Sequence, residues 1–226
     1  MATRNGKQRG TQRHPARPPE NLRQSAATLV SDTALERVQV TGEIQDEDGA
    51  TLTDVDLTEL RWANGRLPGR HFQRLRCRNV VFDRCDLSGV VLEDSTLKRV
   101  EFHDCRMSGL VLAGSTLLED VLFAGCKLNL ANARMVRGRR VEFLGSDLGE
   151  ADLYAAEFTA TRIRDCDLSG AELSQAELDG LRLHGCVLRD LKGVSALRGA
   201  VVGRGQVMDI AMALFAASGI VVDDEE

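Results

Sequence analysis

Large apolar residues recur at every fifth position of the chain between Val80 and Leu191, with one slip in phase, and the residue two places earlier is small or apolar. The series begins with Phe82, Leu87, Leu92, Leu97 and Phe102. A period of five fits neither the 3.6-residue period of a helix nor the strict alternation of a strand, so neither element would bury all these residues on one side. The chain is therefore expected to turn once per repeat and to stack its repeats as a solenoid.

A second period of twenty residues indicates how many repeats make one coil. One column of small residues contains Cys85, Cys105, Cys126, Ser146, Cys166 and Cys186, and one column of aromatic residues contains Phe82, Phe102, Phe123 and Phe143. Four repeats then close one square coil, and about seven coils stack at roughly the 4.8 Å strand spacing. The slip requires one extra residue, which we expect near Glu119 and Asp120, after inward-facing Ser115 and Leu117.

The sequence also predicts the corners and the interior of these coils. Gly89, Gly109 and Gly170 end Asp-Leu-Ser-Gly or Arg-Met-Ser-Gly segments, where a tight turn needs positive φ. Like residues stacked on like residues should fill the interior and leave no room for a ligand. The fold class predicted from these patterns is an all-β solenoid.

Three short motifs carry a resemblance to a known family. Ala151-Asp152-Leu153, Ala171-Glu172-Leu173 and Ala176-Glu177-Leu178 resemble the A(D/N)LXX signature of pentapeptide-repeat proteins. The resemblance implies a right-handed quadrilateral β-helix and covers roughly three quarters of the chain.

The C-terminal segment is similar to the closing segment of the Qnr and MfpA subgroup of that family. The similarity comprises residues 196–202, Gln206, an apolar helix and residues 214–222. It implies a C-terminal capping helix that joins two subunits end to end. It also implies a dimer with the shape and charge of duplex DNA that binds DNA gyrase.

Two apolar stripes are expected on the C-terminal helix. Val207, Ile210, Ala211 and Leu214 would close the open end of the solenoid. Met208, Met212 and Phe215 form a second stripe, which we assign to a homodimer interface because a cap needs only one apolar face. The alternative is a fully buried cap.

Composition divides the 226 residues into three segments. Residues 1–30 are rich in arginine and proline and are expected to form a disordered basic tail. Residues 31–203 form the repeat domain with an N-terminal cap, and residues 204–226 contribute the helix, a short strand and an acidic tail. No run of residues is long and apolar enough to span a bilayer, which favours a cytoplasmic protein without membrane contact.

Candidate chemistry is sparse. The six cysteines occupy inward positions without any C-x-x-C pair, so they are interpreted as wall material and not as metal ligands or disulfides. No nucleophile stands beside a base, and no metal constellation is evident. The sequence therefore predicts a protein that is not an enzyme and has no catalytic residue, cofactor site or metal site.

Acidic residues concentrate between Val141 and Gly180, which is the length of two coils. They are Glu142, Asp147, Glu150, Asp152, Glu157, Asp165, Asp167, Glu172, Glu177 and Asp179, against Arg162 and Arg164. The net eight negative charges compare with roughly six on duplex DNA over the same height. This acidic surface is the predicted partner-binding site.

Two functional hypotheses follow. The first is a dimeric, DNA-mimic-like binder of DNA gyrase or another type II topoisomerase, which modulates the enzyme or protects it from antibiotics, as in quinolone resistance. The repeat domain itself is then not expected to bind nucleic acid. The second is a scaffolding repeat protein that binds an unrelated protein, with the arginine cluster of residues 137–140 and the basic tail as its contact surface. The arginine-rich stretch of residues 61–84 argues against mimicry along the whole rod.

Overall fold

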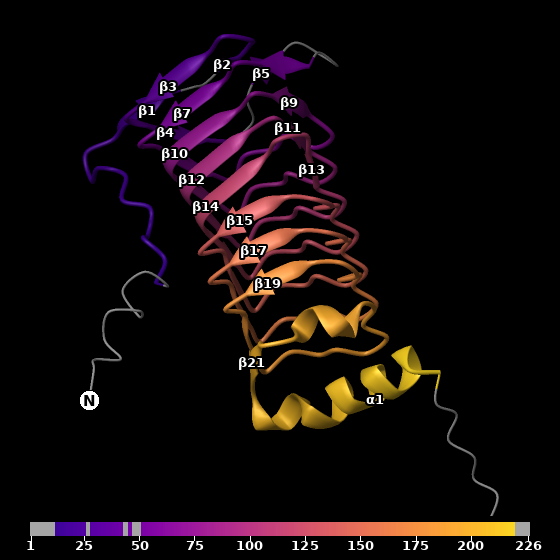
Figure 1. Cartoon of the computed structure of the whole chain (residues 1–226). Helices are drawn as coiled ribbons and strands as arrows, with labels where there is room; N and C mark the ends of the chain where they lie inside the picture. The colour runs from indigo at the N-terminus through magenta and orange to yellow at the C-terminus, as the bar shows by residue number, and fades with distance from the viewer. Residues whose placement is uncertain (1–11, 26–27, 43–44, 47–50, 220–226) are drawn as a thin grey trace, which may run out of the picture.

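The computed structural model describes residues 12–25, 28–42, 45–46 and 51–219, which form a β-solenoid of about eight turns with one C-terminal helix. Parallel strands stack along its length, and successive coils lie one above the next (Figure 1). The fold class predicted from the five- and twenty-residue periods is confirmed. Within the described residues, no helix has both the length and the apolar character needed to cross a bilayer.

Most strands belong to one 15-stranded sheet that bends around a corner of the solenoid. Its main path contains β1 (Arg23–Ser25), β4 (Val38–Thr41), β8 (Arg61–Ala63), β10 (Arg76–Asp83), β12 (Thr96–His103), β14 (Leu117–Ala124), β16 (Glu142–Leu144), β18 (Arg162–Arg164), β20 (Arg182–His184) and β21 (Val201–Val202). Five further strands pair beside this path, namely β3 (Ala34–Glu36), β7 (Asp56–Thr58), β15 (Arg137–Arg139), β17 (Glu157–Thr159) and β19 (Glu177–Asp179). Two smaller sheets contain β6 (Leu52–Thr53), β9 (His71–Gln73), β11 (Val91–Glu93) and β13 (Val111–Ala113), and β2 (Thr28–Leu29) with β5 (Gln45–Asp46).

This pairing gives the solenoid four faces. Three are named below after one of their strands, and the fourth is named after its isolated bridges. The β8 face contains β8, β16, β18, β20 and the second halves of β10, β12 and β14. The β15 face contains β15, β17, β19 and the first halves of the same three long strands. The β11 face is the sheet of β6, β9, β11 and β13. The bridge face is a column of isolated parallel bridges through Arg66, Asp86, Arg106, Lys127, Asp147, Asp167 and Val187.

The interior is built from columns of like residues, as the twenty-residue period predicts. Phe82, Phe102, Phe123 and Phe143 stack with ring centroids 4.9, 5.1 and 5.1 Å apart and near-parallel planes. The cysteine column is buried as well, and the backbone N–H of Cys85 donates to Sγ of Cys105 one coil later. The predicted corner glycines Gly89, Gly109 and Gly170 have φ of 65°, 69° and 69°.

The position of the extra residue differs from the prediction. It lies at the corner formed by Gly114 and Ser115, and not near Glu119 and Asp120, because β12 and β14 pair Leu97 with Leu118. Leu118 therefore faces inward and Leu117 is 40% exposed, while Thr116 is buried in place of Ser115. Asp94 accepts the N–H of Ser115 at 2.9 Å, which holds the enlarged corner without disturbing the register of the strands.

The N-terminal region also differs from the prediction. Residues 34–41 form a coil in register with the next one, with Leu35 beside Leu57 and Val40 beside Trp62, and β1 covers β4. Residues 12–22, expected to be disordered, lie against the outside of the solenoid (Figure 1). They are called the arm below. The first eleven residues of the predicted basic tail lie outside the described residues.

The C-terminal end is closed by two 3-10 turns, η1 (Val194–Leu197) and η2 (Arg204–Gln206), and by α1 (Val207–Ala217). Gln206 is 3% exposed. With its side-chain amide oriented so that both of its groups are satisfied, the amide donates to the carbonyl of Leu183 at 2.8 Å and accepts from the N–H of Cys186 at 3.2 Å. These bonds continue the coil ladder past its last full turn. The side chain of one residue thus supplies the backbone partners that a further coil would provide.

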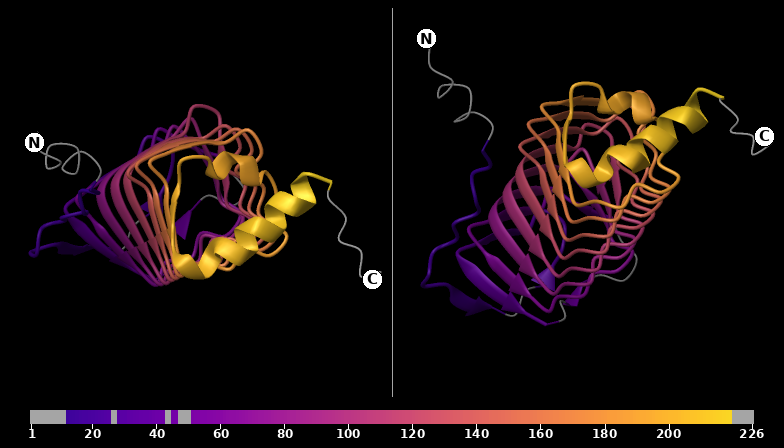
Figure 2. Two further views of the ribbon diagram at one scale, coloured as in Figure 1. Left: turned by 60° about the horizontal axis from the view of Figure 1, so that its bottom comes forward. Right: turned by 90° about the horizontal axis from the view of Figure 1, so that it is seen from below.

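Helix α1 crosses the open end of the solenoid and extends beyond it (Figure 2). The predicted closing stripe is wrong in part, because Ile210 packs against the core but Val207 and Leu214 are 59% and 47% exposed. Leu197 and Val202 pack against the core in the layer before the helix. The strand expected at residues 220–222 and the acidic tail lie outside the described residues.

Candidate functional site: an acidic surface

The ten predicted partner-binding carboxylates do not lie on one surface. Glu142 is on the β8 face, and Glu157, Glu177 and Asp179 are on the β15 face. Asp152 and Glu172 pair through an isolated bridge, in the column of bridges that begins at Val111 on the β11 face. Asp147 and Asp167 are on the bridge face, with Asp165 and Glu150 at the corners before and after it.

Three of the ten carboxylates are neutralised by arginines. Glu142 contacts Arg162 at 3.0 Å and Arg13 at 3.3 Å. Asp152 contacts Arg134 at 2.9 Å, and Glu157 contacts Arg137 at 3.0 Å. Each of these pairs except the one with Arg13 joins two neighbouring coils. These three carboxylates are therefore largely neutralised by arginines of the same chain.

Four carboxylates gather on the bridge face of the last coils. Asp147 and Asp167 are register neighbours one coil apart, and Asp165 and Glu150 are exposed at the adjoining corners. We call these four residues the acidic patch. Among the described residues, none of the four has a cationic side chain within 4.0 Å. The charge of Arg189 contributes to the lowered pKa of Asp167, but no ion pair neutralises any of the four carboxylates among the described residues.

Local turns hold the two bridge-face aspartates in place. Oδ1 of Asp147 accepts the N–H of Gly149 at 3.0 Å. Oδ1 of Asp167 accepts both the N–H and the hydroxyl of Ser169, at 2.8 and 2.6 Å. The hydroxyl bond from Ser169 is the main cause that lowers the pKa of Asp167. The Asp-Leu-Ser-Gly sequence thus builds a corner whose first residue keeps an ionised carboxylate pointing outward.

Net charge over the two acidic coils remains close to that of DNA. Arg13, Arg134 and Arg137 come from outside residues 141–180 and bind carboxylates within it, which reduces the net charge from eight to five negative. Duplex DNA carries roughly six charges over the same height. Charge density alone is therefore compatible with a site that normally holds a DNA backbone.

The arginine cluster of the alternative hypothesis is mostly paired. Arg134 binds Asp152 and lies 4.3 Å above the ring of Tyr154, and Arg137 binds Glu157. Arg140 is 6% exposed and binds Asp120 and Glu119. Arg139 keeps an exposed side chain. Most of this cluster therefore stabilises the coils, which leaves little of it as a contact surface.

The predicted dimer residues are exposed on α1. Met208, Met212 and Phe215 have 71%, 58% and 45% of their surface accessible. Together with exposed Val207 and Leu214 they leave a large part of an 11-residue helix apolar and in contact with solvent. Such a surface on a small protein is typical of an interaction site.

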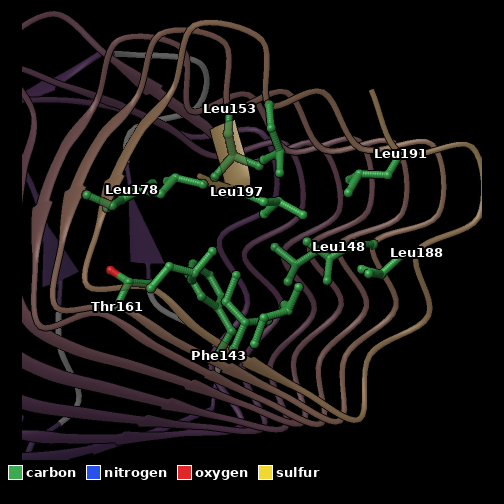
Figure 3. Close-up of a pocket in the computed structure, with 14 residues that line it drawn as sticks. Phe143, Leu148, Leu153, Thr161, Leu178, Leu188, Leu191 and Leu197 are labelled. Carbon is green, nitrogen blue, oxygen red and sulfur yellow. The ribbon is translucent and has the colours of Figure 1, made fainter. Parts of the chain in front are cut away.

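The interior of the last coils, within the part of the chain that the structure describes, does not contain a comparable site. Figure 3 shows leucine and phenylalanine side chains of the last coils pointing toward one another, with Thr161 beside them. The remaining space is about 20 Å³, which is on the scale of one water molecule. Among the described residues, no three His, Cys, Asp or Glu side chains are grouped so that they would hold a metal ion.

Sequence reasoning missed a second charged cluster, where the arm meets the solenoid. Asp120, Arg140, Glu101 and Arg13 join there through short ion pairs. Val81 and Leu122, on outward positions of β10 and β14, are 7% and 9% exposed, which shows that another segment covers them. Apolar residues at outward repeat positions are the sequence signal for such a covered strip.

The chain belongs to the pentapeptide-repeat family. Residues 55–133 match the pentapeptide repeat region, and residues 151–190 match the family of pentapeptide repeats (8 copies). The right-handed quadrilateral β-helix of that family agrees with the fold described above.

One solved structure supports the same fold. A trypsin-treated variant of QnrB1, a plasmid-mediated fluoroquinolone resistance protein, has a TM-score of 0.60 at 17% identity, over 88% of this chain and 95% of that one. HetL, a pentapeptide-repeat protein involved in heterocyst differentiation regulation in the cyanobacterium Nostoc sp. strain PCC 7120, gives a TM-score of 0.39 at 20% identity, over 80% of this chain and 94% of that one. No curated protein sequence matches the chain significantly.

Proposed function

We propose that this protein is a non-enzymatic binder of DNA gyrase or a related type II topoisomerase, and that the acidic patch occupies part of the enzyme's DNA-binding surface. The observation that carries the proposal is the cluster of Asp147, Glu150, Asp165 and Asp167 on one face, three of them exposed and Asp167 half-buried, without an ion pair among the described residues. The hydrogen-bonded coils hold the four carboxylates in fixed positions. This supports the proposal, because a rigid array of charges binds a partner at little entropic cost.

Two resemblances support this choice of partner. The C-terminal segment is similar to that of the Qnr and MfpA subgroup, whose members bind DNA gyrase. QnrB1, which shares the fold, is a fluoroquinolone resistance protein. The functional consequence would be a change in gyrase supercoiling, or in its inhibition by a quinolone.

Neutralising the acidic patch should abolish most of this effect. In the combined variant Asp147→Asn, Glu150→Gln, Asp165→Asn and Asp167→Asn, the amide oxygens can still accept the turn hydrogen bonds, so the fold should persist. Loss of four surface charge contacts is expected to weaken the action on gyrase by at least about tenfold. The measurement is a supercoiling assay with purified gyrase, with and without a quinolone.

The matched control carries the same change in net charge at the other end of the rod. It combines Asp83→Asn, Asp86→Asn, Asp94→Asn and Asp104→Asn, and we expect it to act like the parent. Equal activity of the patch variant and the parent would contradict the proposal. A parent protein without any effect on gyrase would instead favour the scaffolding alternative.

We also propose that two chains associate through α1, with Met208, Met212 and Phe215 at the interface. Burial of these exposed apolar side chains supports association. The acidic patches of the two chains would then flank the junction and lengthen the negative surface.

A charge at the centre of this stripe should produce monomers. Met212→Glu places a carboxylate in an apolar interface, where burial of an unpaired charge is costly. Light scattering is expected to show a dimer for the parent and a monomer for the variant. Met135→Glu, at a corner residue that is 67% exposed, is the control and should remain dimeric. A monomeric parent at micromolar concentration would disprove this arrangement.

A further inference from the structure

The arm is attached to the β8 face by directed polar contacts. Arg13 contacts Glu101 at 2.7 Å and Glu142 at 3.3 Å, and the N–H of Ala16 donates to Glu101 at 3.1 Å. The N–H of His14 donates to Asp120 at 2.9 Å. The arm is not a strand of the sheet, since its bonds go to carboxylate side chains and not to a ladder of backbone groups. The arm is therefore held as a separate segment on the surface of the solenoid, through side chains of the β8 face.

Buried apolar residues accompany these bonds. Val81, Glu101, Leu122 and Glu142 follow one another in register on β10, β12, β14 and β16. Val81 and Leu122 alternate with core residues and therefore point outward, yet they are only 7% and 9% exposed. Neither belongs to the core cluster. Because Pro18 of the arm is itself buried, the arm and this strip shield one another from water.

The charged groups are well removed from solvent. The side chains of Arg13 and Glu101 are 12% and 13% exposed, and that of Asp120 is 3% exposed. Burial alone would raise the pKa of Glu101, but hydrogen bonds from His103 and Arg13 outweigh it and lower the pKa to about 2. Without the arm, the strip would present carboxylates and apolar side chains side by side. Its complement is a chain segment that carries both a guanidinium and apolar residues.

We propose that this strip is a binding site for an extended, arginine-containing peptide segment of a protein partner, and that the arm is its resident ligand. The site comprises Val81, Glu101, Asp120, Leu122 and Glu142. Its ligand places an arginine between Glu101 and Glu142, offers its backbone N–H groups to Asp120 and Glu101, and has a proline five residues after the arginine. A partner segment of this kind replaces the arm when it binds. The site goes beyond the proposed function, because it lies on the β8 face and is not part of the acidic patch.

The experiment uses the full-length chain and a fluorescent synthetic peptide with the sequence of residues 10–22. In the parent, the tethered arm competes at a high effective concentration, so the free peptide should bind weakly. In Arg13→Ala the arm loses its anchoring guanidinium, and anisotropy should show at least about tenfold tighter peptide binding. Arg17→Ala removes an exposed arm arginine and is the matched control, expected to bind the peptide like the parent.

Two further measurements make the result specific to the site. Adding Glu101→Gln to Arg13→Ala should remove the gain in peptide binding, and a peptide with alanine in place of its Arg13 should not bind either variant. Circular dichroism checks that each variant keeps the parent fold. Equal peptide binding by the parent, Arg13→Ala and Arg17→Ala would overturn the proposal, as would binding insensitive to Glu101→Gln. A parent dimer that disappears in Arg13→Ala would also overturn it, by identifying a second copy of the arm as the ligand.

Discussion

The Arg140→Ala variant is expected to lose about 3–5 kcal/mol of unfolding free energy, because it leaves a buried carboxylate without its counter-ion. Nε and Nη2 of Arg140 donate to Asp120 at 2.6 and 2.8 Å, and Nη2 also donates to Glu119 at 2.9 Å. The side chains of Arg140 and Asp120 are 7% and 3% exposed. Urea unfolding followed by circular dichroism measures the loss.

A neighbouring residue gives the control for this prediction. Arg139, the last residue of β15 and the neighbour of Arg140, is exposed, and Arg139→Ala should change stability by less than about 0.5 kcal/mol. Combining Arg140→Met with Asp120→Asn removes both charges and should restore part of the loss, since Asn tolerates the positive φ of 59° at that corner. A single Arg140→Ala variant as stable as Arg139→Ala would show that the pair contributes nothing to stability.

The Phe102→Ala variant is expected to lose about 3–5 kcal/mol as well, for a different reason. The ring of Phe102 is stacked between those of Phe82 and Phe123, at 4.9 and 5.1 Å, and the residue is 3% exposed. Its removal leaves a cavity that hydrogen-bonded coils on both sides cannot close. Thermal unfolding should show a decrease in Tm of roughly 6–20 °C.

Phe102→Leu is the matched variant, because it keeps most of the buried volume. It is expected to cost less than half as much as Phe102→Ala. Equal losses for both variants would indicate that ring stacking, and not filled volume, dominates at this position. No loss for either variant would contradict the layered interior.

The sequence predicted the solenoid because burial repeats with a period that only a turning chain can satisfy. Phe82 over Phe102 and Cys85 beside Cys105 follow directly from the twenty-residue spacing. The extra residue was misplaced because Leu117 and Leu118 are both apolar, and only strand register decides which one faces inward. The N-terminal coil was predicted only as a cap, because it pairs with the next coil at a spacing of 22 residues and not 20.

The candidate site was harder to predict from the sequence than the fold. Counting carboxylates identified the acidic coils, but it did not distinguish Asp147, which is exposed and has no ion pair among the described residues, from Glu142, which lies between two arginines. Ion pairs between coils depend on which residues become vertical neighbours, such as Arg137 and Glu157. The arm was interpreted from its composition as disordered, although Arg13 binds carboxylates of the β8 face and Pro18 is buried. Composition cannot reveal contacts between segments so far apart in the sequence.

Competition with DNA tests the proposed mimicry most directly. Purified gyrase bound to a labelled duplex is titrated with the parent protein and with the acidic-patch variant at several salt concentrations. We expect the parent to displace the duplex, less effectively as salt increases, and the variant to require at least about ten times more protein. Binding of parent and duplex to gyrase at the same time, or equal displacement by both proteins, would contradict the account.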